Sequence, residues 1–362
     1  MSAASDGLEG IVAAETVLSH VDGERGRLIF RGHDIEELAG RTSQEAVAAL
    51  LWDGFAEGSS DPVAIAEALG AARAGAFEIA QPLLARARGL TAVEGLRLLL
   101  AALPDTAATP HHLLATAAMP VFVAALERDR QGLAPLPPDP SLSQAADFLR
   151  MLRGRPALPE HVAALETYLV TVADHGLNAS TFTARVVAST RAGVFSSVVA
   201  ALCALKGPLH GGAPGPVLDM LDAIGSEAQI GPWLERAISQ GDRLMGFGHR
   251  VYRVRDPRAD VLKGVALGLR GGSNRIRFAE AVEAGALRVL ARLKPGRRLD
   301  TNVEFYTALV LEALALPREL FTPIFAIGRV VGWTAHVLEQ TQGGRIIRPQ
   351  SAYVGPIPKA AA

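Results

Sequence analysis

Two histidines stand in glycine-rich breaks of the sequence. His210 lies in the segment KGPLHGGAPGP, and His249 lies in DRLMGFGHRVYRVRDPR. Glycines beside a histidine let the backbone approach a ligand and leave the imidazole ring unobstructed. Either segment alone is equally compatible with a turn that happens to contain a histidine. Together with the arginines and the carboxylate that follow them, the two loops indicate a site where imidazoles handle protons.

Further polar residues occupy breaks between apolar stretches, and they favour acid and base chemistry on a small anion. Arginines in separate breaks can hold the carboxylates of a di- or tri-acid bidentately, which lysine cannot do. Two histidines and a carboxylate can then move protons. The additional candidates are His175, Asn178, Arg258, Glu304, Arg329 and Arg348.

Several of these candidates also have a purely structural interpretation. Arg258, in DPRAD at a predicted helix start, can pair with the aspartate on either side of it. Glu304 can simply complement the dipole at the start of its helix, and Arg348 is compatible with an ordinary surface position. Arg329 is harder to explain this way, because it lies among apolar residues where a charge needs a partner.

Other chemistries lack their sequence signals. The closely spaced histidine and cysteine ligands of zinc sites are missing, and the adjacent His111 and His112 would face different directions on a helix. No GxSxG segment indicates a serine hydrolase. The segment GFGH is too short, with no strand before it, to be a dinucleotide- or phosphate-binding loop. We therefore expect no metal site.

Composition is typical of a globular, helix-rich protein. Of 362 residues, 49% are hydrophobic and 20% charged, and the formal net charge is -1. This balance gives no indication of nucleic acid or an anionic membrane as the main partner. The N-terminus lacks the pattern of a signal peptide, and no apolar run reaches the roughly 18 residues that a membrane span needs. We expect a cytoplasmic protein, in which the one cysteine, Cys203, is a buried filler.

The part of the chain before the helix at Pro159 is predicted to be a structural scaffold. The residues from Thr16 to Gly32 predict a short β-hairpin with its turn at Asp22 and Gly23. Alanine- and leucine-rich helical stretches follow up to about Leu126. The segment GLAPLPPDP predicts an irregular surface loop. The expected breaks between the helical stretches lie at Gly54, Gly75, Pro82, Gly89, Pro104 and Pro110.

The helices that follow carry the candidates at their ends. Apolar residues at spacings of three and four predict a helix from Pro159 that ends near Gly176 and delivers the segment ADHGLNAST. We expect Ser180 or Thr181 to cap the next helix. A further apolar helix, from Phe195 to Leu205, leads into the His210 loop.

A change of character after residue 210 predicts a smaller second domain. Charge and glycine increase, the helices are expected to be shorter, and the run LRGGSNRIR predicts an exposed basic loop. Helices are then predicted from Val303 to Leu316 and through FTPIFAIGRVVGWTAHVLEQ, with Thr322 as N-cap and Pro323 at the first position. The tail RIIRPQSAYVGP is too irregular to be a helix.

Five segments resemble the signature segments of the citrate synthase family, in its bacterial and archaeal short-chain type, which includes 2-methylcitrate synthases. They are GPLHGGAPGPV, MGFGHRVYRVRDPRAD, NVEFYTALVLEALALP, AIGRVVGW and IIRPQSAYVGP. The resemblance implies an all-α, two-domain homodimer with a short N-terminal hairpin. Residues 1–210 and 317–362 would form the large domain, residues 211–316 the small one, and the active site would lie in the cleft between them.

The resemblance also implies the reaction and its catalytic residues. The family condenses acetyl-CoA with oxaloacetate and hydrolyses the citryl thioester. His210 would donate a hydrogen bond to the thioester oxygen while the methyl carbon loses its proton to Glu304. His249 would polarise the ketone of oxaloacetate and protonate the new alkoxide. Whether the thioester is acetyl-CoA or propionyl-CoA turns on about one methylene of pocket volume and is left open.

Binding residues follow from the same resemblance. His175, Arg258 and Arg329 would hold the substrate carboxylates, Arg348 would reach across from the partner subunit, and Asn178 would lie behind them. Closure of the domains on oxaloacetate would create the acetyl-CoA site and exclude water.

Coenzyme A would enter as a thioester substrate, and no tightly bound cofactor is expected. Arg253 is the candidate for a CoA phosphate. The CoA adenine would meet the backbone of the loop formed by Met245, Gly246, Phe247 and Gly248.

Two departures from the family pattern motivate an alternative. The family base is usually an aspartate in NVDFYSG, whereas this chain has Glu304 in NVEFYTA. Gly176 stands where DHELN would be commoner than DHGLN, which removes a charge beside His175. The alternative is a catalytically weakened paralogue that binds oxaloacetate or CoA as a sensor or regulatory subunit.

Overall fold

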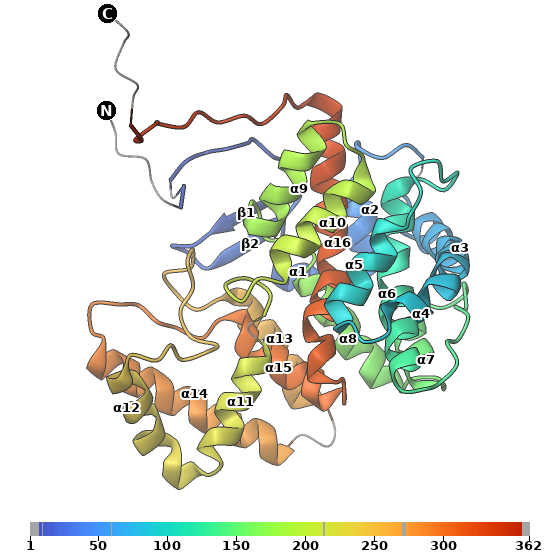
Figure 1. Cartoon of the computed structure of the whole chain (residues 1–362). Helices are drawn as coiled ribbons and strands as arrows, with labels where there is room; N and C mark the ends of the chain where they lie inside the picture. The colour runs from blue at the N-terminus through green and yellow to red at the C-terminus, as the bar shows by residue number, and fades with distance from the viewer. Residues whose placement is uncertain (1–6, 9, 59, 213, 270–272, 357–362) are drawn as a thin grey trace, which may run out of the picture.

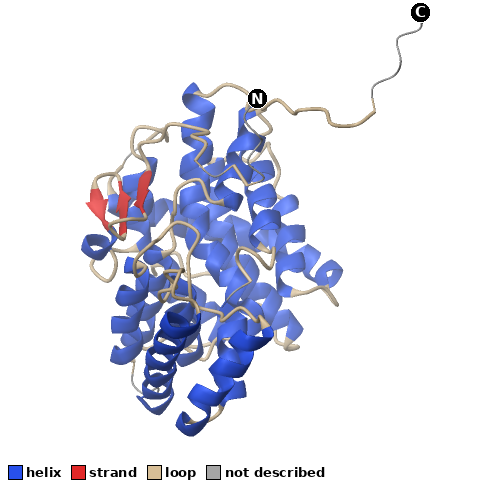
Figure 2. Ribbon diagram, turned by 90° about the vertical axis from the view of Figure 1, so that its left-hand side faces the viewer, coloured by secondary structure: helices blue, strands red, loops and turns tan. Residues whose placement is uncertain are grey.

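The computed structural model describes residues 7–356, except residues 9, 59, 213 and 270–272. Within these residues the fold is almost entirely helical, as predicted, and Figure 2 shows the short strands gathered at one edge of the helical body. Two buried apolar clusters hold it together, a large one among the helices and a smaller one beneath the strands.

The predicted hairpin is confirmed. Strand β1 (Ser19–Asp22) pairs antiparallel with β2 (Arg27–Phe30), and a third strand that was not predicted, β3 (His33–Asp34), pairs with β2. Asp22 Oδ1 accepts hydrogen bonds from the backbone N–H groups of Glu24 and Arg25, and these contacts close the turn. Leu28 and Phe30 alternate inward onto the smaller cluster, so the hairpin is anchored by its apolar face.

The scaffold helices pack around one another, mostly on the right-hand side of Figure 1. Gly75 was wrongly expected to be a break: it lies inside α3, and the packing of α3 on α6 outweighs the roughly 1 kcal/mol that a helical glycine costs. Pro82 instead lies in a 3₁₀ turn, Gln81–Leu83, that leads into α4. The helices are α1 (Ile35–Leu38), α2 (Gln44–Trp52), α3 (Pro62–Ala80), α4 (Leu84–Ala87), α5 (Ala92–Ala101), α6 (His111–Arg130), α7 (Gln144–Arg153) and α8 (Pro159–Thr171).

The second half of the chain begins with α9 (Ala179–Ser189) and α10 (Val194–Leu205). Cys203 lies on the outer face of α10 and is exposed, so the prediction of a buried filler was wrong. The buried face of this helix is formed by Ala201, Leu202 and Leu205. An apolar run alone does not tell which positions of a half-buried helix face inward.

The segment from 211 to 316 has its described helices mostly at the lower left of Figure 1. It contains α11 (Pro214–Ile224), α12 (Ile230–Gln240), α13 (Pro257–Gly268), α14 (Ser273–Leu293) and α15 (Val303–Ala313). The exposed basic loop was predicted from Leu269 to Arg277, and residues 270–272 of it lie outside the described residues. The prediction was wrong for Ser273–Arg277, which form the first residues of α14. With 21 residues, α14 is also longer than the short helices expected in this segment. Ile276, Ala279 and Val282 recur at a spacing of three and are buried, which explains the helix.

Helix α16 (Phe321–Gly343) runs through the centre of the fold, with α2, α6, α8, α9 and α10 packed around it (Figure 1). It is long and apolar enough to cross a membrane, but 94% of its apolar window is buried inside the protein. Thr322 was wrongly expected to cap it. A 3₁₀ turn, Arg318–Leu320, runs directly into α16, and Thr322 Oγ1 instead donates to the carbonyl of Gly211 (3.0 Å), beside His210. The tail after α16 is irregular, as predicted.

Candidate active site

A cavity of about 1270 Å³ collects most of the predicted residues. Four parts of the chain contribute to its wall: the N-terminal arm and hairpin, the loops that follow α8 and α10, the loops that precede α13 and α15, and the central helix α16. The predicted residues on its wall are His175, Asn178, His210, Met245, Gly246, Gly248, His249, Arg253, Arg258, Glu304 and Arg329.

Two predicted residues do not line this cavity. Phe247 is buried against Phe305, with ring centroids 5.3 Å apart, while its two glycine neighbours are on the wall. Arg348 lies exposed in the tail, which runs away from the body of the chain in Figure 1. Within one chain, therefore, Arg348 is not brought to the other candidates.

His175 follows the end of α8 in a tight loop. Its Nε2 lies 3.3 Å from the hydroxyl of Tyr252, and its ring centroid is 5.4 Å from that of His249. Burial, aided by the positive charge of Arg258, holds the pKa of His175 well below its usual range, so the ring is neutral at pH 7. Gly176 adopts a left-handed backbone (φ +57°), a conformation that suits glycine.

Asn178, not Ser180 or Thr181, caps the helix that follows. Its Oδ1 accepts the backbone N–H groups of both residues (3.1 Å each). The expectation for the cap was wrong because the helix begins at Ala179, two residues earlier than a cap at Ser180 requires. The Ser180 hydroxyl donates to Asn178 Oδ1 (2.8 Å) and also lies 2.8 Å from Nε2 of His210. Sequence reasoning treated Ser180 only as a cap and missed this contact.

His210 stands in the loop between α10 and α11. Burial, with a smaller effect from Arg329, lowers the pKa of this histidine to about 4, so it is neutral at pH 7. Ser180 is held in turn by Trp333, whose indole Nε1 donates to its hydroxyl oxygen (3.1 Å). The ring is therefore fixed from α9 and α16.

His249 has a proton position that its contacts define. Its Nδ1 accepts the backbone N–H groups of Val251 and Tyr252, both at 3.0 Å. The neutral ring must then carry its proton on Nε2, which can donate to a ligand. Burial, with the nearby charge of Arg258, lowers the pKa of His249 to about 4.

Arg258 combines the structural and the functional interpretation. Asp256 caps α13 and pairs bidentately with Arg258, with Nε to Oδ1 at 3.0 Å and Nη2 to Oδ2 at 2.8 Å. The predicted pairing with a neighbouring aspartate is thus present, yet Arg258 also lines the cavity. Asp256 Oδ2 further accepts the N–H of Val303 (3.2 Å), which joins the start of α13 to the start of α15. Nothing in the sequence marked Asp256 as this link.

Glu304 lies in the first turn of α15, at the cavity wall. Burial raises its pKa to about 7, although the charges of Arg258 and Arg329 act in the opposite direction. Asn302 caps the helix by accepting the N–H of Glu304 (3.0 Å), and its amide donates to the carbonyl of Gly248 (2.8 Å). This links the backbone of Glu304 to the loop that carries His249. A carboxyl group that titrates near neutral pH suits a general base.

Arg329 supplies a buried positive charge from the middle of α16. Its Nε donates to the carbonyl of Val172 (2.6 Å), and its guanidinium carbon lies 4.8 Å from the centroid of Phe325. Burial lowers its pKa to about 10, which leaves it charged at pH 7. Among the described residues, no carboxylate lies within ion-pair distance of it. A charge of this kind can receive a ligand carboxylate.

The loop before His249 is shaped by its glycines. Gly246 and Gly248 have positive φ angles of 85° and 79°. Their backbones are held by the strand-like segment before α15: Gly248 N–H donates to Asp300 O (2.7 Å), and Gly246 O accepts from Asn302 N (2.9 Å). Arg253 is placed by its own N–H, which donates to Gly23 O in the hairpin turn (2.8 Å). The hairpin thus borders the cavity.

The sequence matches a known family model, and curated relatives agree with it. The model for the citrate synthase C-terminal domain matches residues 7–350. The chain is 40% identical to a citrate synthase of Haloferax volcanii, over 96% of this chain and 95% of the relative. It is 35% identical to citrate synthase 2 of Bacillus subtilis, over 98% of this chain and 96% of the relative.

Solved structures of the same name are similar in fold. Citrate synthase from Thermotoga maritima superposes with a TM-score of 0.86 at 34% identity, covering 99% of this chain and 97% of that one. A ternary complex of carboxymethyl coenzyme A and oxaloacetate with citrate synthase from Thermoplasma acidophilum gives a TM-score of 0.88 at 28% identity, covering 100% and 99%.

Proposed function

Since the chain belongs to the citrate synthase family, we propose that its cavity binds oxaloacetate and a coenzyme A thioester side by side. The enzyme is a citrate synthase-type acyltransferase: it condenses acetyl-CoA, or propionyl-CoA, with oxaloacetate and hydrolyses the acyl-CoA intermediate. The observation that carries the site assignment is the convergence of His210, His249 and Glu304 on one cavity that Arg258 and Arg329 also line.

Oxaloacetate is a dianion, and its carboxylates would be held by Arg258 and Arg329. Both side chains are almost fully buried, so each offers its charge where little water competes. His175, neutral and anchored on Tyr252, would add a hydrogen bond. The ketone oxygen would then face Nε2–H of His249, the only ring position of that histidine left to donate.

Glu304 would remove a proton from the methyl carbon of the thioester. His210 would stabilise the enol or enolate by donating a hydrogen bond to the thioester oxygen. This role requires the ring proton on Nδ1, and Ser180 supports it: its backbone N–H donates to Nε2 of His210 (3.4 Å), which makes Nε2 the acceptor of the neutral ring.

The carbon nucleophile would then attack the ketone of oxaloacetate. The carbonyl electrons move to oxygen, and His249 gives its Nε2 proton to the new alkoxide. Water cleaves the citryl thioester, which releases citrate and CoA. The weakened-paralogue alternative has no support from the cavity, because Glu304 keeps a carboxylate on its wall and the three predicted histidines line it together with Arg258 and Arg329.

We further propose the two-domain division at residues 210 and 316. His249, Arg258 and Glu304 come from the segment 211–316, whereas His175, His210 and Arg329 come from the rest of the chain. Closure of one part on the other around oxaloacetate would bring these groups together and exclude water.

Coenzyme A would bind at the open end of this cavity. The backbone of the loop 245–248 would contact the adenine, and Arg253 on the same wall would bind a phosphate. No tightly bound cofactor is required by these steps.

A homodimer would complete the site with Arg348 of the second subunit. The tail that carries Arg348 leaves the body of its own chain and exposes apolar side chains, including Ile346, Tyr353 and Val354. Such residues are typical of a segment that packs on a partner. A cytoplasmic location stays our prediction from the sequence.

The proposal is tested by mixing the protein with acetyl-CoA and oxaloacetate and following the free thiol of CoA. We expect release that depends on both substrates, and a parallel assay with propionyl-CoA ranks the two thioesters. Folded protein that releases no CoA above the uncatalysed background would contradict the proposed function.

A further inference from the structure

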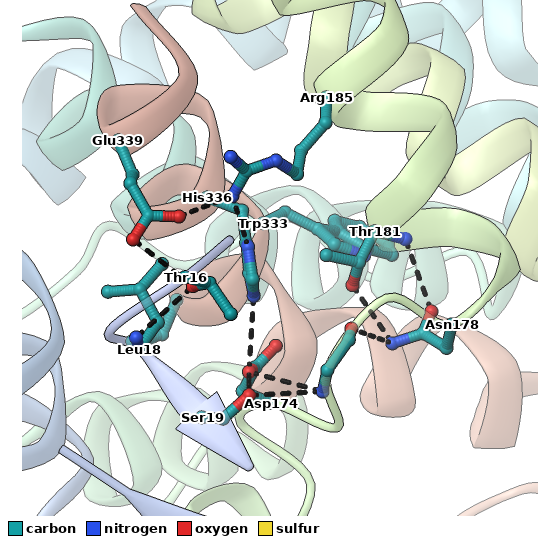
Figure 3. A network of polar contacts seen from close by, with 12 residues as sticks. Thr16, Leu18, Ser19, Asp174, Asn178, Thr181, Arg185, Trp333, His336 and Glu339 are labelled. Carbon is teal, nitrogen blue, oxygen red and sulfur yellow. Dashed lines mark hydrogen bonds and ion pairs between the residues drawn. The ribbon is translucent and has the colours of Figure 1, made fainter. Parts of the chain in front are cut away.

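A buried polar network lies behind the loop that carries His175 (Figure 3). Its centre is Asp174, whose side chain is fully buried. Asp174 Oδ2 accepts hydrogen bonds from Ser19 Oγ of β1, from His336 Nε2 of α16 (3.3 Å) and from the backbone N–H of Gly176 (3.4 Å). One carboxylate oxygen thus joins the hairpin, the central helix and the loop itself.

His336 is fixed in one tautomer within this network. Arg185 Nη1 lies 2.9 Å from Nδ1 of His336, and because a guanidinium can only donate, Nδ1 must accept. The proton of the neutral ring is therefore on Nε2, directed at Asp174, as Figure 3 shows for the line from Arg185 through His336. Arg185 also pairs with Glu339 one turn further along α16.

The same network anchors the N-terminal arm. Glu339 Oε1 accepts the hydroxyl of Thr16 (3.1 Å) and the N–H of Val17 (3.0 Å). Residues of this arm, including Leu8 and Ile11, line the cavity. The arm and the His175 loop are therefore held by one connected set of groups, although Asp174, His336 and Arg185 do not themselves line the cavity.

The loop sits as close to α16 as glycine permits. The N–H of Gly332 donates to Ala173 O (3.1 Å), and a Cβ at position 332 would lie 2.3 Å from that oxygen and 2.7 Å from Asp174 Oδ1. That second carboxylate oxygen is buried and has no hydrogen-bond partner among the described residues. Its charge acts on Arg329, since each of the two groups favours the charged form of the other.

We propose that Asp174 is a positioning residue for oxaloacetate binding: held by His336, it fixes the loop that presents His175 and provides the buried negative charge that balances Arg329. The inference rests on the proposed function, in which His175 and Arg329 bind the substrate carboxylates. Asp174 itself touches no reacting atom. Its effect should therefore appear in the affinity for the keto-acid more than in the affinity for the thioester.

The direct test is Asp174→Asn, which keeps the shape and removes the charge. A hydrogen bond to a charged group is worth enough that we expect the KM for oxaloacetate to rise about 10- to 100-fold. The KM for acetyl-CoA, measured at saturating oxaloacetate, should change less than about threefold, which is below the effect of losing a hydrogen bond to a charged group. Ser19→Ala removes one donor from the same oxygen, and we expect a smaller rise in the same constant.

Asp147→Asn is the matched control. Asp147 is also a fully buried aspartate, paired with Arg73 (2.9 Å), but it lies outside the cavity wall. We expect it to lower the thermal midpoint and leave the KM for oxaloacetate unchanged, which separates positioning from general loss of stability.

Two results would overturn the inference. One is folded Asp174→Asn protein whose oxaloacetate KM stays within twofold of the wild type, and the other is an equal rise of both KM values. If Asp174→Asn does not fold, Ser19→Ala takes its place, and an oxaloacetate KM within twofold of the wild type in that variant would overturn the inference. If the wild type shows no turnover, the proposed function fails, but calorimetric binding of oxaloacetate to both proteins still decides the role of Asp174.

Discussion

The substitution Glu304→Gln tests the assignment of the base with the least disturbance. Glutamine keeps the size of the side chain and can still be placed by the cap at Asn302, whose contact is to the backbone of residue 304. It removes the only function that the proposal needs, a carboxylate that accepts a proton. General bases contribute about 100- to 10,000-fold, so kcat should fall by that factor, or about 3 to 5 kcal/mol on the barrier.

Oxaloacetate affinity should be largely retained in this variant. Arg258 takes its ion pair from Asp256, and no carboxylate is paired with Arg329 among the described residues, so neither arginine depends on Glu304 for its orientation. Removing a negative charge beside the substrate carboxylates can only favour their binding. The assay combines thiol release for kcat with calorimetry for the dissociation constant of oxaloacetate.

A matched control lies on the same helix. Glu312 near the end of α15 pairs with Arg275 and does not line the cavity, so Glu312→Gln should leave turnover unchanged. Folded Glu304→Gln protein that keeps more than about a tenth of wild-type kcat, well above the loss expected for a general base, would refute the reasoning. A large loss of oxaloacetate binding without loss of kcat would refute it equally.

Three further predictions concern Glu304 and Arg329 at the site and Glu166 outside it. Because burial raises the pKa of Glu304 to about 7 and a base must be ionised, kcat/KM for oxaloacetate should fall as the pH drops below about 7; a flat profile from pH 5 to 8 would contradict this. Arg329→Lys should weaken oxaloacetate binding about 10- to 100-fold by calorimetry, since lysine cannot make the bidentate contact. Burial and the nearby charge of Glu45 raise the pKa of Glu166 to about 7, so the stabilising effect of this group is present below about pH 4.5 and is lost as the pH rises through 7. The Glu166→Gln variant should therefore have a higher thermal midpoint than the wild type, and the difference should be larger at pH 8 than at pH 5. The corresponding gain in the free energy of unfolding is limited to about 3 kcal/mol.

Local patterns in the sequence predicted the elements that present the site. The turn residues Asp22 and Gly23 indicated the hairpin, and proline and glycine marked the loops around His175, His210 and His249. These signals depend on neighbours along the chain, which is why they were legible. Errors arose where packing decides the outcome: Gly75 is carried through α3 by its contact with α6, and the exposure of Cys203 depends on which face of α10 is covered.

The supporting contacts of the site were beyond sequence reasoning for the same reason. Ser180 meets His210 across 30 positions, and His336 meets Asp174 across 162. No local pattern indicates that such residues are adjacent, because only the folded arrangement of α9, α16 and the loops between them brings them together. Arg258 differs from them: its pairing with Asp256 followed from neighbouring residues, and its place at the site was predicted from the family resemblance.

The central claim is that two imidazoles and one carboxylate surround a keto-acid held by arginines. A crystal structure of the protein with oxaloacetate and an unreactive acetyl-CoA analogue tests it most directly. We expect the carboxylates of oxaloacetate on Arg258 and Arg329, its ketone oxygen on Nε2 of His249, and the Glu304 carboxylate within about 3.5 Å of the methyl carbon or its equivalent. Ligands bound in the cavity with Glu304 and the two histidines directed away from both reacting carbons would contradict the account.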